Sequence, residues 1–317
     1  MALAVAAALL VGSATAKTIT VDDDPGMADY EHIQDAVNAA SPGDTIYVFE
    51  GLYIEHVVVD KWDSLQLIGD DRENVVIDGG WSGTCLTIKK DNTTVTNFTV
   101  QSSGSSHTGI YIKDADDCLV ANNTINANGD GIKLDGSNKN RIGNNKITSN
   151  SGSGIYLNYC EYNEIMDNDI RDNSDGIYLD YSNIQNEITH NDITSNSNGI
   201  NSDMYCSSKI TNNNVTDNSK YGIYLYWCAS SQITDNNIRG NGNTGIYLSA
   251  GQYSKITNNK VISNNGNGIC LSGDNNRNSK ITNNEIISNN GYGLYLYDSE
   301  KESEIAQNNI DLSLIHI

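Results

Sequence analysis

Positive charge is scarce in this chain of 317 residues, in which 19 lysines and arginines stand against 40 aspartates and glutamates, for a formal net charge of −21. A surface this acidic repels phosphate backbones and anionic lipids, so nucleic-acid binding is not expected. Acidic uronate polymers would also be repelled unless cations lay between the two negative surfaces.

Hydrophobic residues are also few, at 38% of the chain, and asparagine is abundant. Such a composition is typical of disordered, asparagine-rich tracts. A disordered chain, however, has no reason to keep isoleucine, leucine and glycine in strict register, as this chain does over most of its length. We therefore expect a folded protein.

Long apolar runs are absent except at the start, where residues 2–15 are largely apolar and lead into Ala14-Thr15-Ala16, a pattern typical of signal-peptide cleavage. This run is too short to cross a bilayer, so no membrane span is expected. A signal peptide over residues 1–16 and an extracellular or cell-surface location are predicted, although the positive charges that usually precede such a run are missing. The alternative is a buried N-terminal helix.

The six cysteines show no Cys-x-x-Cys spacing and no paired histidine, which disfavours a zinc or redox site. Cys206 and Cys228 are 22 residues apart, which is the length of the repeat described below. Stacked strands lie about 4.8 Å apart, and this is within the Cα range of a disulfide. The pair is therefore either a disulfide or two small half-buried side chains.

A short motif, Gly-Ile-Tyr-Leu or a close variant, occurs nine times between residues 109 and 296, at intervals of 22 to 25 residues. Asparagine recurs in the same register at two further positions. A repeat of this length indicates a solenoid and must be recognised before any single motif is weighed. The motif glycines are Gly109, Gly131, Gly154, Gly176, Gly199, Gly222, Gly245, Gly268 and Gly293. The asparagines are Asn123, Asn145, Asn168, Asn191, Asn213, Asn236, Asn259, Asn284 and Asn308 in one series, and Asn128, Asn150, Asn173, Asn196, Asn218, Asn241, Asn264 and Asn289 in the other.

One unit of the repeat indicates how the chain runs. The aliphatic residues of its motif alternate with Tyr156, so in a strand they face the core and the tyrosine faces solvent. Ile142 and Ile147 are five residues apart and share a face only if the chain bends between them, which places Asn145 inside the bend. Each unit is therefore a set of short strands separated by bends.

No helical period occurs in these units, so each unit forms one turn of a coil, and stacked turns pair each strand with its counterparts above and below. The predicted fold is an all-β, right-handed parallel β-helix of about 22–25 residues per turn. We expect one such domain over residues 17–310, with the N-terminal cap and first strands over residues 17–60 and regular repeats over residues 95–310.

The repeated asparagines and glycines then have structural roles. Each inward asparagine is expected to bond backbone groups of the bend and the equivalent asparagine one turn along, because an unsatisfied buried polar group costs about 1–3 kcal/mol. Each motif glycine is expected to allow a tight corner, including one with positive φ, where its strand begins. We assign these ladders to the structure and not to an active site.

A short amphipathic helix is predicted before the first regular turn. Asp29 is in position to N-cap it, its apolar face begins at Ile33, and Pro42 and Gly43 mark its end. Such a helix would cover the core and shield the first strand edge, as solenoids require.

Two segments near the N-terminus carry a characteristic order of residues: Asp29-Tyr30 with Ile33-Gln34-Asp35-Ala36-Val37, and Ser41-Pro42-Gly43-Asp44-Thr45-Ile46-Tyr47-Val48 with Gly51-Leu52-Tyr53-Ile54-Glu55. With these segments the chain resembles right-handed β-helix surface proteins of the pectin-lyase-like superfamily, and among them the secreted NosD-like, carbohydrate-binding and sugar-hydrolase (CASH) type. The resemblance covers roughly residues 17–310. It is specific for fold and not for chemistry, because such repeats occur in binders, hydrolases, lyases, epimerases and structural proteins.

The last residues, Leu312–Ile317, fit neither a repeat nor a cap. We interpret residues 311–317 as a non-native or truncated tail, and the alternative is a strand that closes the coil. A turn that ends near Ile310 without a cap leaves a strand edge open, which predicts end-to-end self-association.

Motifs of related enzymes are largely missing. The polysaccharide lyases of this fold need calcium ligands and a basic residue on one face, and no set of aspartates surrounds Arg141 or the other arginines. Asn173-Ser174-Asp175 resembles one polygalacturonase motif, but the paired aspartates and the Gly-His-Gly that should follow do not occur. The resemblance therefore gives no catalytic motif.

No cofactor is expected. The five histidines and four methionines lie on different turns, whereas the copper site that the NosD name implies needs converging ligands. Asp22, Asp23 and Asp24 near Asp29 are the candidate oxygen ligands for Ca²⁺, but a solvated acidic turn is the favoured interpretation.

One outward column is rich in tyrosine, and aspartates and further aromatic residues follow it along each strand. Aromatic rings flanked by carboxylates suit sugars, whose C–H faces stack on rings and whose hydroxyls form hydrogen bonds. The alternative is that outward tyrosine simply suits a strand. The predicted carbohydrate-binding residues are Tyr156, Tyr178, Asp180, Tyr181, Asp203, Tyr224 and Trp227.

Two functions of different class remain. The first is a secreted or cell-surface, non-catalytic module that binds a polysaccharide or cell-envelope glycan or serves as a structural part of the envelope; even spacing supports it, because enzymes of this fold usually carry long inserted loops. The net charge favours a neutral or amine-bearing glycan. The second is a polysaccharide hydrolase or lyase with Asp180 and Asp203 as catalytic candidates, since adjacent turns place carboxylates at about the 5 Å separation of retaining glycosidases.

Overall fold

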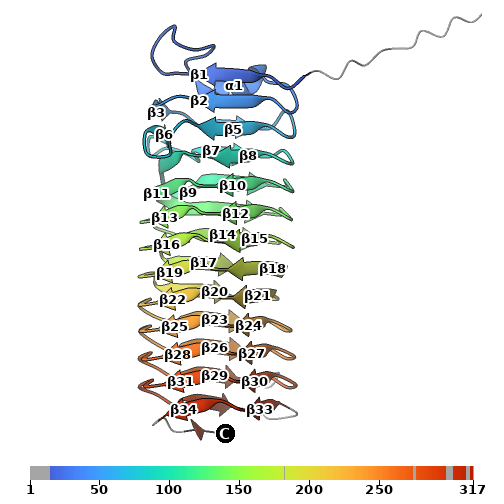
Figure 1. The fold of residues 1–317 in the computed structure, drawn as a ribbon, viewed down its shortest axis with the longest axis vertical. Coiled ribbons are helices and arrows are strands. Elements are labelled where there is room, and N and C mark those ends of the chain that lie inside the picture. The colour runs from blue at the N-terminus through green and yellow to red at the C-terminus, as the bar shows by residue number, and fades with distance from the viewer. Residues whose placement is uncertain (1–14, 182, 274–275, 298–302, 312–314, 317) are drawn as a thin grey trace, which may run out of the picture.

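The computed structural model describes residues 15–181, 183–273, 276–297, 303–311 and 315–316, and the chain forms a right-handed parallel β-helix. Stacked turns run from β1 at the N-terminal end of the coil to β33 and β34 at the other end (Figure 1). Each regular turn contributes one strand to each of three sheets, here called sheets 1, 2 and 3. The predicted fold is confirmed.

Sheet 1 has thirteen strands in order along the axis. They are β1 (Thr18–Val21), β2 (Thr45–Val48), β5 (Gln66–Gly69), β8 (Thr94–Thr96), β10 (Leu119–Ala121), β12 (Arg141–Gly143), β15 (Glu164–Met166), β18 (Ile184–Thr189), β21 (Ser207–Thr211), β24 (Gln232–Thr234), β27 (Lys255–Thr257), β30 (Lys280–Thr282) and β33 (Glu304–Ala306).

Sheets 2 and 3 share β9 (Thr99–Lys113) and β11 (Thr124–Asp135), which are long enough to run through both. The other strands of sheet 2 are β3 (Gly51–Ile54), β6 (Val75–Asp78), β13 (Lys146–Thr148), β16 (Asp169–Arg171), β19 (Asp192–Thr194), β22 (Asn214–Thr216), β25 (Asn237–Arg239), β28 (Lys260–Ile262), β31 (Glu285–Ile287) and β34 (Asn309–Asp311). Those of sheet 3 are β4 (Val57–Val59), β7 (Leu86–Ile88), β14 (Ile155–Asn158), β17 (Asp175–Leu179), β20 (Asn198–Ser202), β23 (Ile223–Tyr226), β26 (Ile246–Ser249), β29 (Ile269–Ser272), β32 (Leu294–Tyr297) and β35 (Ile315–His316).

The core is a stack of aliphatic side chains from all three sheets. Ile142, Ile147 and Ile155 come from the three strands of one turn, and all three are fully buried. The bend predicted between the first two is present at Asn144, which has a φ of 55°. Tyr156 faces outward and is half-buried, as its place in the alternation predicted.

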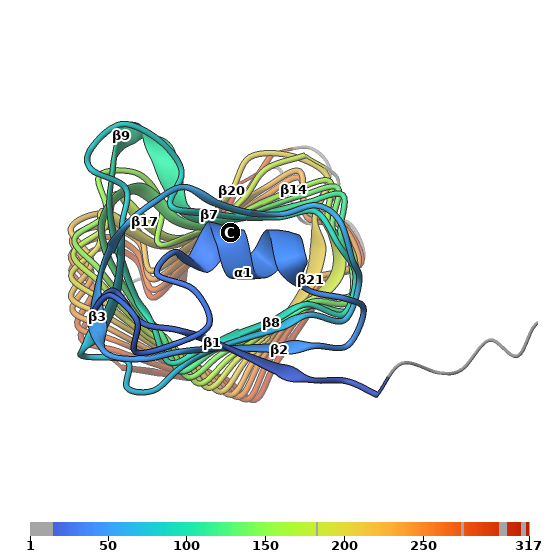
Figure 2. The same ribbon diagram turned by 90° about the horizontal axis from the view of Figure 1, so that it is seen from above.

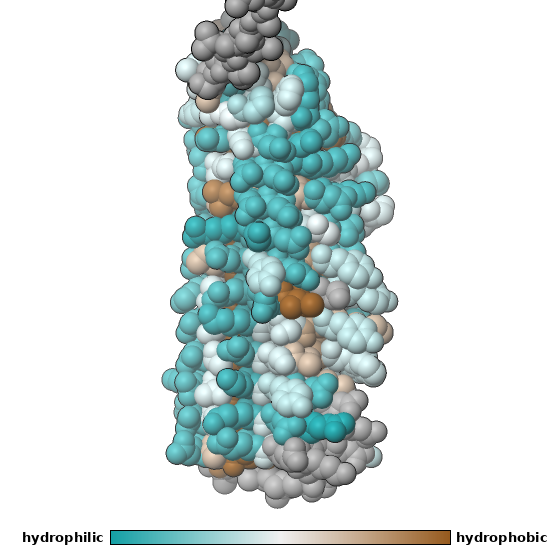
Figure 3. Space-filling model, turned by 90° about the vertical axis from the view of Figure 1, so that its right-hand side faces the viewer, coloured by the Kyte–Doolittle hydropathy of each residue, from teal (hydrophilic) through white to brown (hydrophobic). Residues whose placement is uncertain are grey.

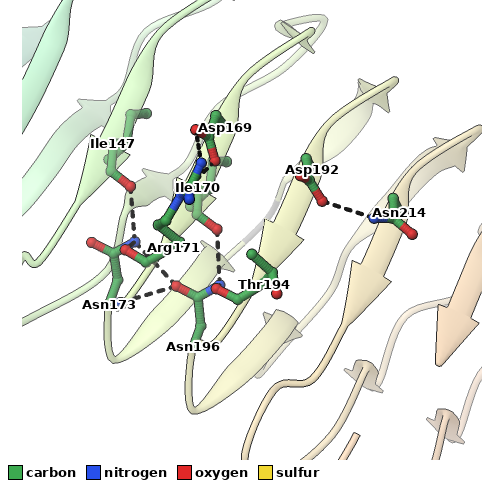
Figure 4. Close-up of polar contacts among 9 residues, drawn as sticks. All are labelled: Ile147, Asp169, Ile170, Arg171, Asn173, Asp192, Thr194, Asn196 and Asn214. Carbon is green, nitrogen blue, oxygen red and sulfur yellow. Dashed lines mark hydrogen bonds and ion pairs between the residues drawn. The ribbon is translucent and has the colours of Figure 1, made fainter. Parts of the chain in front are cut away.

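The asparagine ladders bridge consecutive turns as expected. At the corner between sheets 2 and 3, the Asn173 side-chain amide donates to the carbonyl of Ile147 (3.2 Å) and to Oδ1 of Asn196 on the next turn (3.1 Å) (Figure 4). Asn196 repeats the pattern with the carbonyl of Ile170 at 3.1 Å. Asn173 is therefore a ladder residue and not part of a polygalacturonase site.

A third ladder, which the sequence analysis missed, lies at the corner between sheets 3 and 1. The backbone N–H of Asn140 donates to Oδ1 of Asn163 (2.8 Å), and that of Asn163 donates to Oδ1 of Asn186 (2.9 Å). Buried serines such as Ser231 and Ser254 occupy this corner on later turns, and the N–H of Ser231 donates to the hydroxyl of Ser254. The change of residue type hides the ladder in the sequence.

The motif glycines are required for close approach and not for positive φ. All nine lie in the described part of the chain, and none has a positive φ, so that part of the expectation was wrong. A Cβ built on Gly154 would lie 2.7 Å from the carbonyl oxygen of Gly176 and 2.7 Å from Cγ2 of Ile170. Glycine is present because adjacent turns touch at this point.

Helix α1 (Ile33–Ala39) lies across the interior of the coil when the molecule is seen from above (Figure 2), so the predicted cap is present. The predicted N-cap was wrong. Asp29 instead accepts hydrogen bonds from the N–H and hydroxyl of Thr20. The helix N-terminus is satisfied by Glu55, whose carboxylate accepts from the N–H groups of Ile33 and Gln34, both at 3.0 Å.

The predicted signal peptide lies outside the described residues apart from its last two. Of the predicted tail, the structure describes the backbone of Asp311, Ile315 and His316, and Leu312 lies outside it. Ile315 pairs with Leu294 of the preceding turn. In the described part of the chain, no helix combines the length and apolar character needed to cross a membrane.

Candidate functional site

Outward tyrosines form a column along sheet 3, here called the sheet column. Tyr156 and Tyr178 are in register on neighbouring strands, and their rings stack with centroids 5.3 Å apart and planes 28° apart. Tyr224 and Tyr247 stack in the same way at 5.0 Å and 8°. Parallel in-register pairing brings like residues together at each turn, so these stacks follow directly from the repeat.

Several tyrosines of the sheet column donate a hydrogen bond to an aspartate that lies at the end of the sheet 3 strand of the next turn. The hydroxyl of Tyr156 donates to Asp180 at 2.5 Å, and that of Tyr178 donates to Asp203 at 2.6 Å. Partial burial, and then the bonded carboxylate, raise the pKa of both tyrosines above the ordinary range, because each disfavours a phenolate. The hydroxyls are therefore held as protonated donors.

A second aromatic column, here called the turn column, lies where sheet 3 turns into sheet 1. It consists of Tyr159, Tyr181, Tyr205 and Trp227, all exposed. The first two stack at 5.9 Å and 12°, and the last two meet edge to face at 5.9 Å. Figure 3 faces this edge of the coil, where pale ring-shaped side chains project from its middle and lower part.

The backbone beneath the turn column is unusual for such large side chains. Tyr159, Tyr205 and Trp227 have φ of 51°, 50° and 54°. Elsewhere this left-handed conformation is taken mostly by asparagine and aspartate, which tolerate it, and by serine, although Trp81, Tyr162 and Tyr253 adopt it as well. Bulky aromatic residues in this region are outliers, and conformational strain of this kind gathers at functional sites.

A groove of about 470 Å³ lies between the two columns; we call it the aromatic groove. It is lined by Tyr178, Asp180, Tyr181, Asp203, Met204, Tyr224 and Tyr226. Five of the seven predicted binding residues are therefore among its lining residues. The other two contact its walls, because Tyr156 stacks on Tyr178 and the Trp227 ring lies 6.2 Å from that of Tyr226. Met204 was not predicted, because nothing in the repeat marks its position.

Lysine interrupts the sheet column two turns before Tyr178, the first tyrosine of that column to line the groove. The ammonium of Lys133 lies 4.7 Å from the ring centre of Tyr156 and 5.7 Å from that of Tyr111, as in a cation–π sandwich. The charge is thus held between rings, and Lys133 is not among the residues that line the aromatic groove.

The cysteines divide into one cross-link and four buried thiols. Cys206 and Cys228 form a disulfide between consecutive turns, with their Cα atoms 4.4 Å apart. Burial raises the pKa of Cys160 to about 11 and that of Cys85, Cys118 and Cys270 to about 12. Cys85, Cys118 and Cys160 belong to the hydrophobic core, whereas Cys270 is buried at an outward position of sheet 3, in register with Tyr247 and Tyr295. The cysteines of the disulfide directly follow Tyr205 and Trp227 in the chain.

Two protein-family models match the sequence of this chain. A family model described as periplasmic copper-binding protein (NosD) matches residues 37–213, and one described as right handed beta helix region matches residues 201–312. No protein of curated function matches the chain significantly.

Solved structures with the same fold include two modules of mannuronan C-5 epimerases from Azotobacter vinelandii. The AlgE6 A-module is 16% identical with a TM-score of 0.70, and the match covers 90% of each chain. The AlgE4 A-module is 19% identical with a TM-score of 0.68, and the match covers 89% of this chain and 92% of that one. The periplasmic alginate epimerase AlgG is 14% identical, with a TM-score of 0.56 and coverage of 88% and 82%. At such identities the likeness shows the fold alone.

The copper in the family's description has no matching donor set here. Across the described ranges, no three histidine, cysteine, aspartate or glutamate side chains are grouped so that they could hold a metal ion. The acidic residues considered for Ca²⁺ have other contacts: Asp23 accepts the N–H of Leu52, and Asp29 is bonded to Thr20. We therefore derive no metal chemistry for this chain.

Proposed function

Because the chain belongs to the NosD family of β-helix proteins, we propose that it is a non-catalytic protein that binds a polysaccharide or cell-envelope glycan in the aromatic groove. The observation that carries the proposal is the groove itself, in which four tyrosines and two aspartates converge. Alginate epimerases with the same fold act on polysaccharide, and this supports a role of the same general kind.

The chemistry of the lining suits a sugar. Aromatic faces accept the C–H side of a pyranose ring, and carboxylate oxygens accept hydrogen bonds from its hydroxyls. Asp180 and Asp203 each accept a tyrosine hydroxyl on one oxygen, and the second oxygen of Asp180 also accepts the N–H of Tyr181 at 3.0 Å. Each carboxylate oxygen has two lone pairs, so acceptor sites remain on both aspartates. The groove is open to solvent and shallow, so we expect weak affinity, with a Kd of about 10–1000 µM.

Charge narrows the class of glycan. The chain carries a net charge of −21, and none of the described residues that line the aromatic groove is a lysine, arginine or histidine. A uronate polymer, such as the mannuronan named for the epimerases, would meet two carboxylates there without a cation to offset them. The ligand we propose is therefore uncharged or amine-bearing.

We also propose that the protein is exported and acts outside the cytoplasm. The disulfide between Cys206 and Cys228 supports this, because disulfides persist mainly in oxidising compartments. The apolar run that ends at Ala16 supports it as well. N-terminal sequencing of the secreted product should begin at Lys17, and a mature protein that retains residues 2–16 would contradict the proposed cleavage.

The alternative is hydrolysis or elimination at Asp180 and Asp203. A panel of plant, algal and microbial polysaccharides, tested with and without Ca²⁺, separates the two functions when both retention and new chain ends are measured. Retention without new chain ends is the expected result. New chain ends that disappear in Asp180→Asn or Asp203→Asn would establish the enzyme instead, and neither retention nor product on any polysaccharide would overturn both.

A further inference from the structure

The sheet column is interrupted at three turns, by Lys133, Asn201 and Cys270, and the interruption at Asn201 lies between two tyrosines that line the aromatic groove. Asn201 of β20 is in register with Tyr178 on one side and Tyr224 on the other, at a position that tyrosine occupies on both neighbouring strands. Its side-chain amide donates to Asp175 on the preceding turn at 3.1 Å. The Asn201 side chain is thus held against the coil. The space between the rings of Tyr178 and Tyr224, where a third tyrosine ring would stack, is left open; we call this position the open level.

Each tyrosine beside this level has one face covered and one face toward the gap. Tyr156 stacks on the far side of Tyr178, and Tyr247 stacks on the far side of Tyr224. Tyr221 contacts both Tyr224 and Tyr247, so it lies beside that stack. The two free faces are therefore the walls of a slot inside the groove.

The width of the slot fits one ring. Tyr178 and Tyr224 are two strand spacings apart, which is roughly 9.5 Å. One ring in van der Waals contact with both walls needs roughly 7–8 Å. The slot therefore admits a single pyranose ring between the tyrosines and has no room for two.

Negative charge lies at the end of the same level. Asp203 lies two residues after Asn201 on the same turn, here called the open turn. Asp180 occupies the equivalent place one turn earlier. In the part of the chain that the structure describes, neither carboxylate forms an ion pair with a basic side chain. Tyrosine faces and carboxylates whose negative charge is not offset by a basic side chain together favour a cation, as in aromatic cages that bind ammonium groups.

The open turn departs from the repeat at a second position and is reinforced beside it. The buried leucine of neighbouring motifs, such as Leu179 and Leu225, is replaced by the smaller Ser202. The disulfide from Cys206 then ties this turn to the following one. The turn that lost both its outward ring and its inward leucine is thus the turn that carries a cross-link.

We propose that this slot binds one amino-sugar unit of a glycan, with its ring between Tyr178 and Tyr224 and its protonated amine beside Asp203. The inference rests on the proposed glycan-binding function and specifies the sugar for the same groove. The protonated amine forms an ion pair with the carboxylate, which an uncharged hydroxyl or acetamide cannot form.

Calorimetric titration with glucosamine oligomers and N-acetylglucosamine oligomers of equal length tests the proposal, below the pH at which the amine loses its proton. We expect at least tenfold tighter binding of the glucosamine oligomer. Asp203→Asn should reduce that preference to less than threefold, and Asn201→Tyr should fill the slot and weaken binding of both at least tenfold. The matched control is Thr194→Tyr, which adds a ring on the same turn but on sheet 2 and should bind as the wild type does.

The outcomes separate this inference from the proposed function. Equal binding of both oligomers, unchanged by Asp203→Asn, would overturn the amino-sugar assignment and leave glycan binding standing. Wild-type affinity in Asn201→Tyr, with thermal unfolding confirming that the variant is folded, would overturn the slot. If no glycan of any class binds the wild type, the proposed function itself fails.

Discussion

The hydroxyl of Tyr178 donates a hydrogen bond of 2.6 Å to the carboxylate of Asp203, which lies on the next turn of the coil. The bond joins the sheet column of tyrosines to the aspartates at the strand ends. Tyr156 and Asp180 are related in the same way. Both aspartates that line the aromatic groove are therefore oriented by tyrosines from the preceding turn.

Alkaline stability should depend on the burial of the Tyr178 hydroxyl and, second, on this bond, because both raise the pKa of Tyr178. The pKa of Tyr178 is raised in the folded protein, so the folded state keeps a proton that the unfolded state loses above a pH of about 10. The stabilisation is complete below that pH and declines as pH rises toward the folded-state pKa. Thermal unfolding at increasing pH should show a smaller decline for Tyr178→Phe than for the wild type. Identical declines, with the exposed Tyr205→Phe as control, would mean that the Tyr178 hydroxyl, through burial and its bond together, makes no pH-dependent contribution to stability.

Removal of one ladder asparagine should destabilise the coil. The Asn191 amide donates to the carbonyl of Ile165 at 2.9 Å and to Asn213 at 3.0 Å, all in the core. Asn191→Ala should lower the free energy of unfolding by about 1–3 kcal/mol, because buried polar groups lose their partners. Denaturant unfolding measures this, with the exposed Lys146→Ala expected to be nearly neutral. Equal effects would contradict the inward assignment of the asparagine.

Addition of one methyl group at a motif glycine should also be costly. In Gly154→Ala the new Cβ lies 2.7 Å from the carbonyl oxygen of the next turn, so neighbouring turns must separate. We expect a loss of about 1–3 kcal/mol, the usual cost of overpacking. Gly143→Ala is the matched control, because its nearest neighbour would be at 3.4 Å, an ordinary contact. A neutral Gly154→Ala would show that the turns are not in close contact there.

Thiol labelling should separate the two classes of cysteine. The four free thiols are buried and have raised pKa values, so they should not react with a thiol reagent in the folded protein. Unfolding without reductant should expose four reactive thiols, and unfolding with reductant should expose six. Six reactive thiols without reductant would show that Cys206 and Cys228 are not joined.

The repeat predicts the fold because every turn solves the same packing problem with the same residue types. The sequence-based predictions were wrong where a residue from another turn makes the contact that was assigned to a neighbour in the sequence. Glu55, and not Asp29, satisfies the helix N-terminus, because the coil brings a later turn beneath it. The glycines are explained by contact between turns, which spacing along one turn does not reveal.

The candidate site was only partly predictable for a related reason. Register alone brought Tyr156, Tyr178 and Tyr224 onto one face. The slot depends instead on an exception, Asn201, whose importance is visible only when the rings on both sides are seen to stack. A departure from the repeat carries no meaning until the structure shows what it leaves open.

The central claim, that the aromatic groove binds glycan, is tested most directly by retention on a broad glycan array. The wild type should be retained on at least one uncharged or amine-bearing glycan. Simultaneous Tyr178→Ala and Trp227→Ala substitutions should abolish that retention, while cooperative thermal unfolding, at a midpoint lowered only by the lost Tyr178 hydrogen bond and ring stacks, should confirm that the variant is folded. Failure of the wild type to bind any glycan, or wild-type retention by the double variant, would contradict the account.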